Sequence, residues 1–225
     1  MAHMKSIDKL TLLEMINNFQ FYIGLPDGLS QLPLPQYIKI KRKKLTIPKD
    51  LKEFTDNICY GQRLFLMRKE ENDFGSILRV VNGYYYPLVT RYEMHKLIIY
   101  KGKYKWDEDN ALLFGKNILH LYVKDLYPVA MHLTTLIGEM AEREQKLLHR
   151  EPTKMELAAG IEKLNVFSEL TSLDFLRDTM KCTVAEVLLT PYNECLVRFM
   201  LAKEQTDYQE RYMNEMNNKT KTKTV

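Results

Sequence analysis

The sequence predicts a mainly α-helical protein: a helical bundle with a short extended N-terminal arm and one small hairpin. Three observations favour this class. Only nine glycines and eight prolines occur in 225 residues, and several of the prolines lie between residues 26 and 48. Elsewhere apolar residues recur at spacings of three and four, the period of a helix that buries one side. Threonines followed three residues later by an acid mark helix starts in the last third of the chain.

Residues 1–50 are expected to form a docking helix followed by a basic extended arm. Apolar residues from Ile7 to Ile23 keep helical spacing until Gly24 and Pro26 end the pattern. Alternating residues 37–40 then indicate an extended segment, in which the cations either contact phosphate or an acidic partner, or simply protect an exposed strand edge. These cations are Lys39, Lys41, Arg42, Lys43 and Lys44.

Residues 51–150 are expected to form a central helical domain. Thr55 or Asp56 is predicted to cap a short helix, and residues 57–70 give a second one. A third helix over residues 74–87 is predicted to end at Gly83 and Pro87.

The second half of this central region contains a hairpin signal and two more helices. Alternation over residues 93–106 predicts a short hairpin that turns at Gly102. Asp107 is the expected N-cap of the next helix, and Pro128 is expected in the first turn of the one after it.

Residues 151–225 are expected to hold short helices, one long amphipathic helix and a polar, basic tail. Thr190 as N-cap and Pro191 at the first helical position predict the start of the long helix. Three capping boxes precede it, formed by Thr153 with Glu156, Thr171 with Asp174, and Thr183 with Glu186.

Composition limits the classes of protein that fit. The net charge of +4 permits contact with phosphate without requiring it. No apolar run approaches the roughly 20 residues of a membrane span, so a soluble, intracellular protein with no membrane partner is expected. Cys59, Cys182 and Cys195 contain no CxxC pair, which argues against a disulfide framework and against structural zinc.

Catalytic motifs are absent from the sequence. It contains no phosphate-binding glycine loop, no GxSxG elbow and no HExxH helix. Cys195 is followed by no histidine that could activate it, and a buried position on a helix explains it better. The sequence therefore indicates a protein that is not an enzyme and uses no cofactor or metal.

Residues 171–190 suggest a helix-turn-helix, which makes a DNA-binding regulator an alternative function. The second helix of this segment offers Thr183, Ala185 and Glu186, with no arginine or glutamine to read base edges. We therefore expect poor sequence-specific binding from this segment.

Two stretches resemble structural and assembly proteins of tailed bacteriophages. The first lies between residues 47 and 66, and the second is the helical C-terminal part from Leu157 onward. The resemblance implies an oligomeric head–tail connector or tail ring component, or alternatively a tail assembly chaperone. Its implied partners are further copies of itself, portal or tail proteins and, nonspecifically, DNA; its implied location is the virion, and the host cytoplasm during assembly. The matching residues of the first stretch are Ile47, Pro48, Asp56, Ile58, Gly61 and Gln62.

The long C-terminal helix is expected to pack and to assemble. An apolar stripe, together with Cys195, is predicted to face inward, with the charges of Lys203, Asp207 and Arg211 facing outward and pairing at spacings of four. Tyrosine, methionine and arginine are enriched in interfaces, so one flank is expected to meet a second subunit. The predicted interface residues are Val197, Leu201, Tyr208, Arg211, Tyr212 and Met216.

Overall fold

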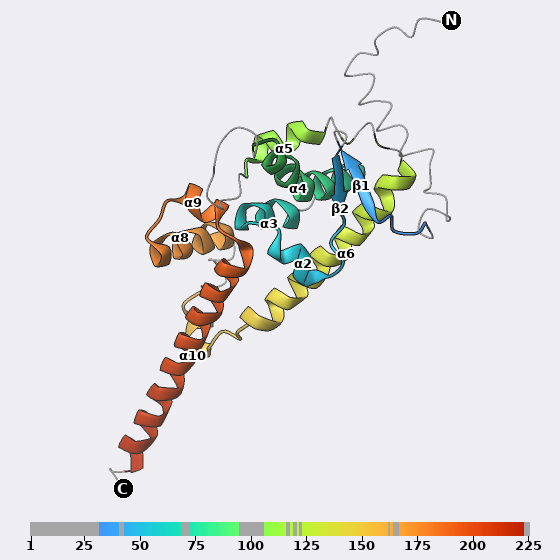
Figure 1. Cartoon of the computed structure of the whole chain (residues 1–225). Coiled ribbons are helices and arrows are strands. Elements are labelled where there is room, and N and C mark those ends of the chain that lie inside the picture. Colours follow the sequence, from blue (N-terminus) through green and yellow to red (C-terminus); the bar gives the residue numbers. More distant parts are fainter. Residues whose placement is uncertain are drawn as a thin grey trace, which may run out of the picture.

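The computed structural model describes residues 32–40, 43–68, 73–94, 106–115, 118, 121, 123–161, 163 and 167–222. Within these residues the chain forms nine helices and one two-stranded hairpin (Figure 1), which confirms the predicted mainly helical class. The predicted docking helix before Gly24 and the predicted hairpin at Gly102 lie outside these residues. None of the described helices is long and apolar enough to cross a membrane.

The basic arm is one antiparallel hairpin made of β1 (Tyr37–Ile40) and β2 (Lys43–Thr46). Ile38 and Ile40 alternate with exposed residues and are fully buried, so one side of β1 belongs to the core. β1 packs against α6 and β2 against α4, which fixes the hairpin to the body of the protein.

The first two helices are α2 (Leu51–Asp56) and α3 (Tyr60–Met67). Asp50 caps α2, because its carboxylate accepts a 2.8 Å hydrogen bond from the Glu53 amide. The prediction that Thr55 or Asp56 caps this helix is wrong, since both lie in its last turn.

Helix α4 (Asp73–Met94) runs through Gly83 and Pro87, so the prediction that it ends there is wrong. Pro87 has no amide hydrogen to donate to the Gly83 carbonyl, four residues earlier. The side chain of Gln62 replaces that donor, with a 2.9 Å hydrogen bond from Nε2 to the Gly83 oxygen. A Cβ at residue 83 would lie 2.8 Å from atoms of Phe65 and Leu66, so glycine lets α3 approach α4 closely.

The core is completed by α5 (Glu108–Phe114) and α6 (Val123–Leu148). Asp107 caps α5 as predicted, accepting a 2.9 Å hydrogen bond from the Asn110 amide. Helix α6 starts at Val123, so Pro128 lies in its second turn and not in its first. The apolar sides of α4, α5 and α6 join β1, α2 and the start of α10 in one continuous core.

The C-terminal part confirms two of the three predicted capping boxes, at Thr153 and at Thr183. Thr171 lies inside a helix instead, where its hydroxyl donates to the Phe167 carbonyl. Thr190 ends the preceding helix, and the long helix begins at Tyr192, so the prediction that Thr190 is its N-cap and Pro191 its first helical residue is wrong. The four helices are α7 (Lys154–Ala158), α8 (Ser168–Met180), α9 (Val184–Leu189) and α10 (Tyr192–Thr222).

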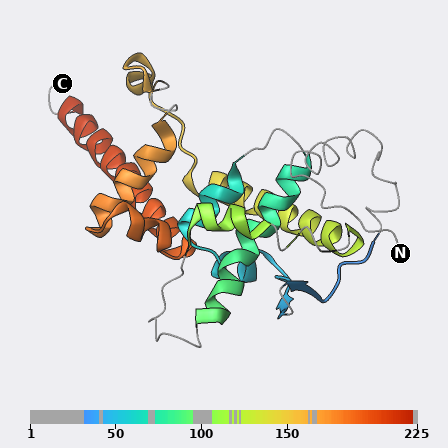
Figure 2. The same cartoon turned by 90° about the horizontal axis from the view of Figure 1, so that it is seen from above.

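A short antiparallel bridge between Cys59 and Pro191 joins the first and last parts of the chain. The Tyr60 amide donates to the Thr190 carbonyl at 2.9 Å, and the Tyr192 amide donates to the Ile58 carbonyl at 3.0 Å. We call these contacts the joint. The joint fixes where α10 begins relative to α3. Helices α8, α9 and α10 lie at the end of the molecule opposite the hairpin (Figure 2).

We expect Gln62→Leu to lower the free energy of unfolding by about 2–4 kcal/mol, because it leaves the Cys59 amide and the Gly83 carbonyl buried without partners. Denaturation in urea measures this loss. The matched control is Gln145→Leu, on the exposed side of α6, for which a change within about 0.5 kcal/mol is expected. Equal effects of the two substitutions would contradict the role of Gln62.

Candidate protein-interaction surface

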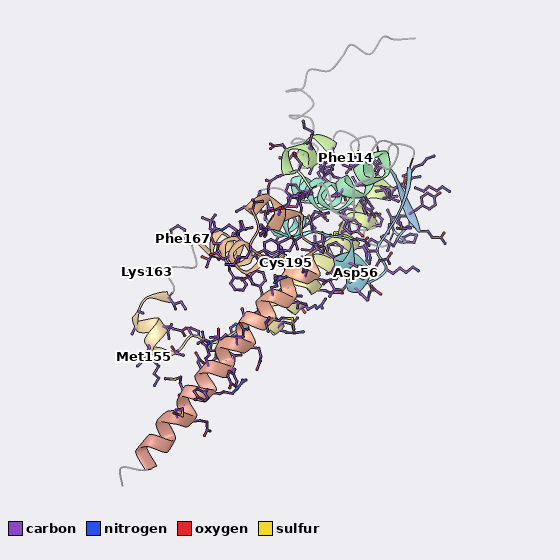
Figure 3. All side chains as sticks on the ribbon, turned by 60° about the vertical axis from the view of Figure 1, so that its left-hand side comes forward. Asp56, Phe114, Met155, Lys163, Phe167 and Cys195 are labelled. Atoms are coloured by element: carbon purple, nitrogen blue, oxygen red, sulfur yellow. The ribbon has the colours of Figure 1, made fainter. Side chains whose placement is uncertain are left out.

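Helix α10 has a buried base, residues 192–199, and a projecting part, residues 200–222, which we call the shaft. Tyr192, Cys195 and Leu196 are buried, and the ring of Phe199 stacks on Phe175 of α8 with centroids 5.5 Å apart. Beyond this base the helix extends away from the body (Figure 1), and Figure 3 places Cys195 at the body end of the helix. Thirty-one residues give it a length of about 46 Å.

The apolar stripe of α10 faces solvent, so the prediction that it packs inward is wrong. Tyr208 is 60% exposed and Tyr212 54% exposed, and their rings lie 6.4 Å apart, stacked along the helix. We call this set the outer stripe: Val197, Leu201, Tyr208, Tyr212 and Met216.

The polar side of the shaft faces the protein, because its charges find partners there. Arg150 follows the end of α6, and its Nε lies 3.8 Å from a carboxylate oxygen of Asp207. It also pairs with Glu210 of α10 and, at 3.0 Å, with Glu156 of α7. Lys203 Nζ donates to the Leu147 carbonyl at 3.2 Å. These contacts replace the expected pairing of Asp207 within its own helix.

The Arg150 contacts also hold α7 beside the shaft. Figure 3 shows Met155, on α7, next to the middle of α10. Hydrogen bonds from Thr153 and from Arg150 lower the pKa of Glu156, so this carboxylate stays charged at neutral pH. Two acids of α10 and one of α7 thus share a single guanidinium.

A partly open cavity of about 190 Å³ lies between α3, α6, α8 and the base of α10. Its polar wall contains the Arg63–Glu144 pair, with 3.0 Å between Nε and Oε1. The two charges neutralise each other, and the carboxylate of Glu169 also lines the cavity. Burial raises the pKa of Tyr60, which keeps the phenol of this wall protonated at neutral pH.

The buried cysteines are poor nucleophiles. Burial raises the pKa of Cys59 and of Cys195 to about 12, so both remain protonated thiols at neutral pH. Across the part of the chain that the structure describes, no group of three or more His, Cys, Asp or Glu residues is placed to hold a metal ion.

The basic hairpin brings two of its five predicted cations together. Lys39 and Lys44 are directly opposed across the strands on the exposed side, and Lys44 Nζ lies 4.5 Å from the centre of the Tyr37 ring. Lys41 and Arg42 lie outside the residues that the structure describes, as does the side chain of Lys43. Contact of these cations with phosphate or an acidic partner stays a prediction.

The predicted helix-turn-helix segment consists of α8, a turn and α9. Lys181 ends α8 with a left-handed backbone (φ 53°), and α9 packs against α3. Arg177 of α8 pairs with Asp174 and Asp178, so its charge is already compensated. This arrangement gives no specific support to the reading of base edges.

Part of the first stretch that resembles phage proteins lies in or near the joint. Asn193 Nδ2 donates to Asp56 Oδ1 at 2.8 Å, and Ile58 is fully buried. A Cβ at Gly61 would lie 2.5 Å from the Trp106 ring and 3.0 Å from the Leu188 carbonyl oxygen, so only glycine fits there without displacement. The two resembling stretches, distant in sequence, therefore contact each other directly.

Sequence reasoning missed Arg150. The available signal was the spacing of Asp207 and Glu210, which puts two acids on one side of a helix facing away from the outer stripe. It also did not predict that Met155 of α7, and Phe167 and Leu170 at the start of α8, are exposed.

No protein-family model matches this chain, and neither a curated protein nor a solved structure matches it.

We expect Arg150→Gln to loosen α7 from α10 without unfolding the core, because ion pairs that solvent reaches contribute little to the free energy of unfolding. Hydrogen exchange should accelerate in residues 151–160 and in the middle of α10. Lys146→Gln removes an exposed cation near the end of the same helix α6 and is the control. Unchanged exchange in the Arg150 variant would contradict the role of this cluster.

We expect the free energy of unfolding to fall as the pH rises from about 9 toward 12. An unfolded thiol loses its proton near pH 8.5, whereas Cys59 and Cys195 keep theirs until about pH 12 in the folded state. The folded state then binds more protons than the unfolded state, so stability decreases by about 1.4 kcal/mol per pH unit for each thiol. Urea denaturation at several pH values measures how steeply the free energy of unfolding falls with pH. Cys195→Ser should make this fall less steep by the contribution of one thiol. An equally steep fall in the variant and in the unaltered protein would contradict the assignment.

Proposed function

We propose that this chain is a non-enzymatic structural or assembly protein of a tailed bacteriophage that works as a homo-oligomer, in a head–tail connector or tail ring. The observation that carries the proposal is the outer stripe of α10, held facing solvent along a helix that projects from the body. A tail assembly chaperone with the same surface is the alternative role.

The energetics of the outer stripe support an interaction surface. Burying a large apolar side chain contributes about 1.5–3 kcal/mol, and Leu201, Tyr208 and Tyr212 are each more than half exposed in the single chain. This stabilisation becomes available only when another surface covers the stripe. Tyrosine and methionine are also common in protein interfaces, and the rigid helix offers them at low entropic cost.

The contacts that hold α10 against the rest of the protein support the same proposal. Arg150 and Lys203 fix the inner side of the shaft, so α10 cannot rotate the stripe inward without breaking these contacts. The buried, protonated thiols of Cys59 and Cys195 favour a structural rather than a catalytic role for the base of the helix.

The phage assignment rests on the resemblance of the two stretches that form the joint. Under this proposal the joint holds α10 in a fixed direction, and Lys39 and Lys44 at the opposite end of the molecule contact an acidic neighbour or DNA. A chaperone differs in one measurable respect, because it would be absent from purified virions.

Size-exclusion chromatography with light scattering tests the proposal, with the chain alone and with portal or tail proteins. We expect an oligomer that Tyr208→Glu dissociates, because the new charge lies in the middle of the outer stripe. Gln145→Glu adds the same charge on the exposed side of α6, away from the stripe, and should leave the oligomer intact. A strict monomer that binds neither these proteins nor DNA would overturn the proposal.

A further inference from the structure

The flank of the outer stripe carries the charged residues Glu204, Arg211 and Glu215. Glu204 and Arg211 lie on the same edge of the stripe, with exposed side-chain fractions of 68% and 61%. Their 2.7 Å ion pair spans seven residues, about 10 Å along the helix axis. Within this pair, Glu204 is nearer the body and Arg211 is nearer the tip, and Glu215 lies one turn beyond Arg211.

This order of charges distinguishes the two ways of pairing with a second α10. In an antiparallel pair related by a two-fold axis, the same flank of both helices meets, so Glu204 of each copy faces Arg211 of the other. In a parallel pair the flank instead faces the opposite edge of the stripe, where the side chains are the uncharged Gln205 and Gln209. Charge complementarity therefore favours the antiparallel arrangement.

The spacing of the stripe also suits a pair of straight helices. Val197 and Tyr208 are eleven residues apart, as are Leu201 and Tyr212, which is close to three full turns. The stripe therefore follows the helix axis with little winding. With Glu204 opposite Arg211, Leu201 of one copy packs between Tyr212 and Met216 of the other.

The rest of the molecule leaves room for this pairing. The far end of α10 lies clear of the body (Figure 1), and Arg150 and α7 occupy the opposite side of the shaft from the stripe. In an antiparallel pair the two bodies lie at opposite ends of the paired helices, so they do not compete for the stripe.

We infer that the occupant of the outer stripe is α10 of a second copy of this chain, paired antiparallel, with reciprocal ion pairs between Glu204 and Arg211. This inference rests on the proposed self-association and specifies its contact. Such a contact closes after two copies, so the growth of a ring requires a second surface.

Charge reversal with mixing tests the pairing. Glu204→Arg and Arg211→Glu each place like charges opposite one another twice in the antiparallel pair, so each variant alone should raise the dissociation constant of the pair by about tenfold or more. Mixing the two variants should restore association to within about threefold of the unaltered chain, because one then carries cations at both positions and the other acids. Neither variant has the ion pair within its own helix, so only a contact between chains explains such a rescue.

Sedimentation velocity on the full-length chains, one of them fluorescently labelled, gives the readout. Glu142→Lys reverses an exposed acid on α6 and is the control, expected to leave association unchanged. If the unaltered chain is monomeric, the proposed oligomer fails and this pairing with it. If it self-associates but the reversed variants behave like the unaltered chain, or mixing gives no rescue, the antiparallel pairing is overturned while the oligomer stands.

Discussion

The structure depends on one buried amide side chain. Gln62 accepts a hydrogen bond from the Cys59 amide at the start of α3, and it donates to the Gly83 carbonyl that Pro87 leaves without a donor. Since unpaired polar groups in a core are costly, these bonds fix α3 against α4. The same Cys59 forms the bridge to Pro191, so the position of α10 follows from the position of α3.

The orientation of α10 shows that available partners, and not hydrophobicity alone, decide which side of a helix is covered. The last turn of α6 offers the carbonyl of Leu147, and Arg150 just after this helix offers a guanidinium. Both contact the polar side of the shaft. Each of these contacts is individually weak. The larger free energy gained by burying the apolar side chains of the outer stripe therefore remains available for association with another molecule.

Several local contacts were predictable from the sequence, although Thr171 and Thr190 do not cap the helices predicted for them, and the distant contacts were not predictable. The caps at Asp107, Thr153 and Thr183 each involve residues only three positions apart, so the pattern contains the whole interaction. Pro87 was misjudged because its compensating donor comes from α3, in a different helix. The inward-facing side of α10 was misjudged for the same reason, since Arg150 and Glu210 are 60 residues apart. The residues of the stripe were identified correctly, but their direction was not.

The joint has a mechanical consequence. Asn193, in the first turn of α10, is tied to Asp56 at the end of α2, and Lys203 one third of the way along is tied to the end of α6. Arg150, just after α6, adds a third contact further along, at Asp207 and Glu210. A force applied at the tip of α10 is thus transmitted at three separated points to the first two thirds of the chain, so a displacement of the tip moves the whole body with it.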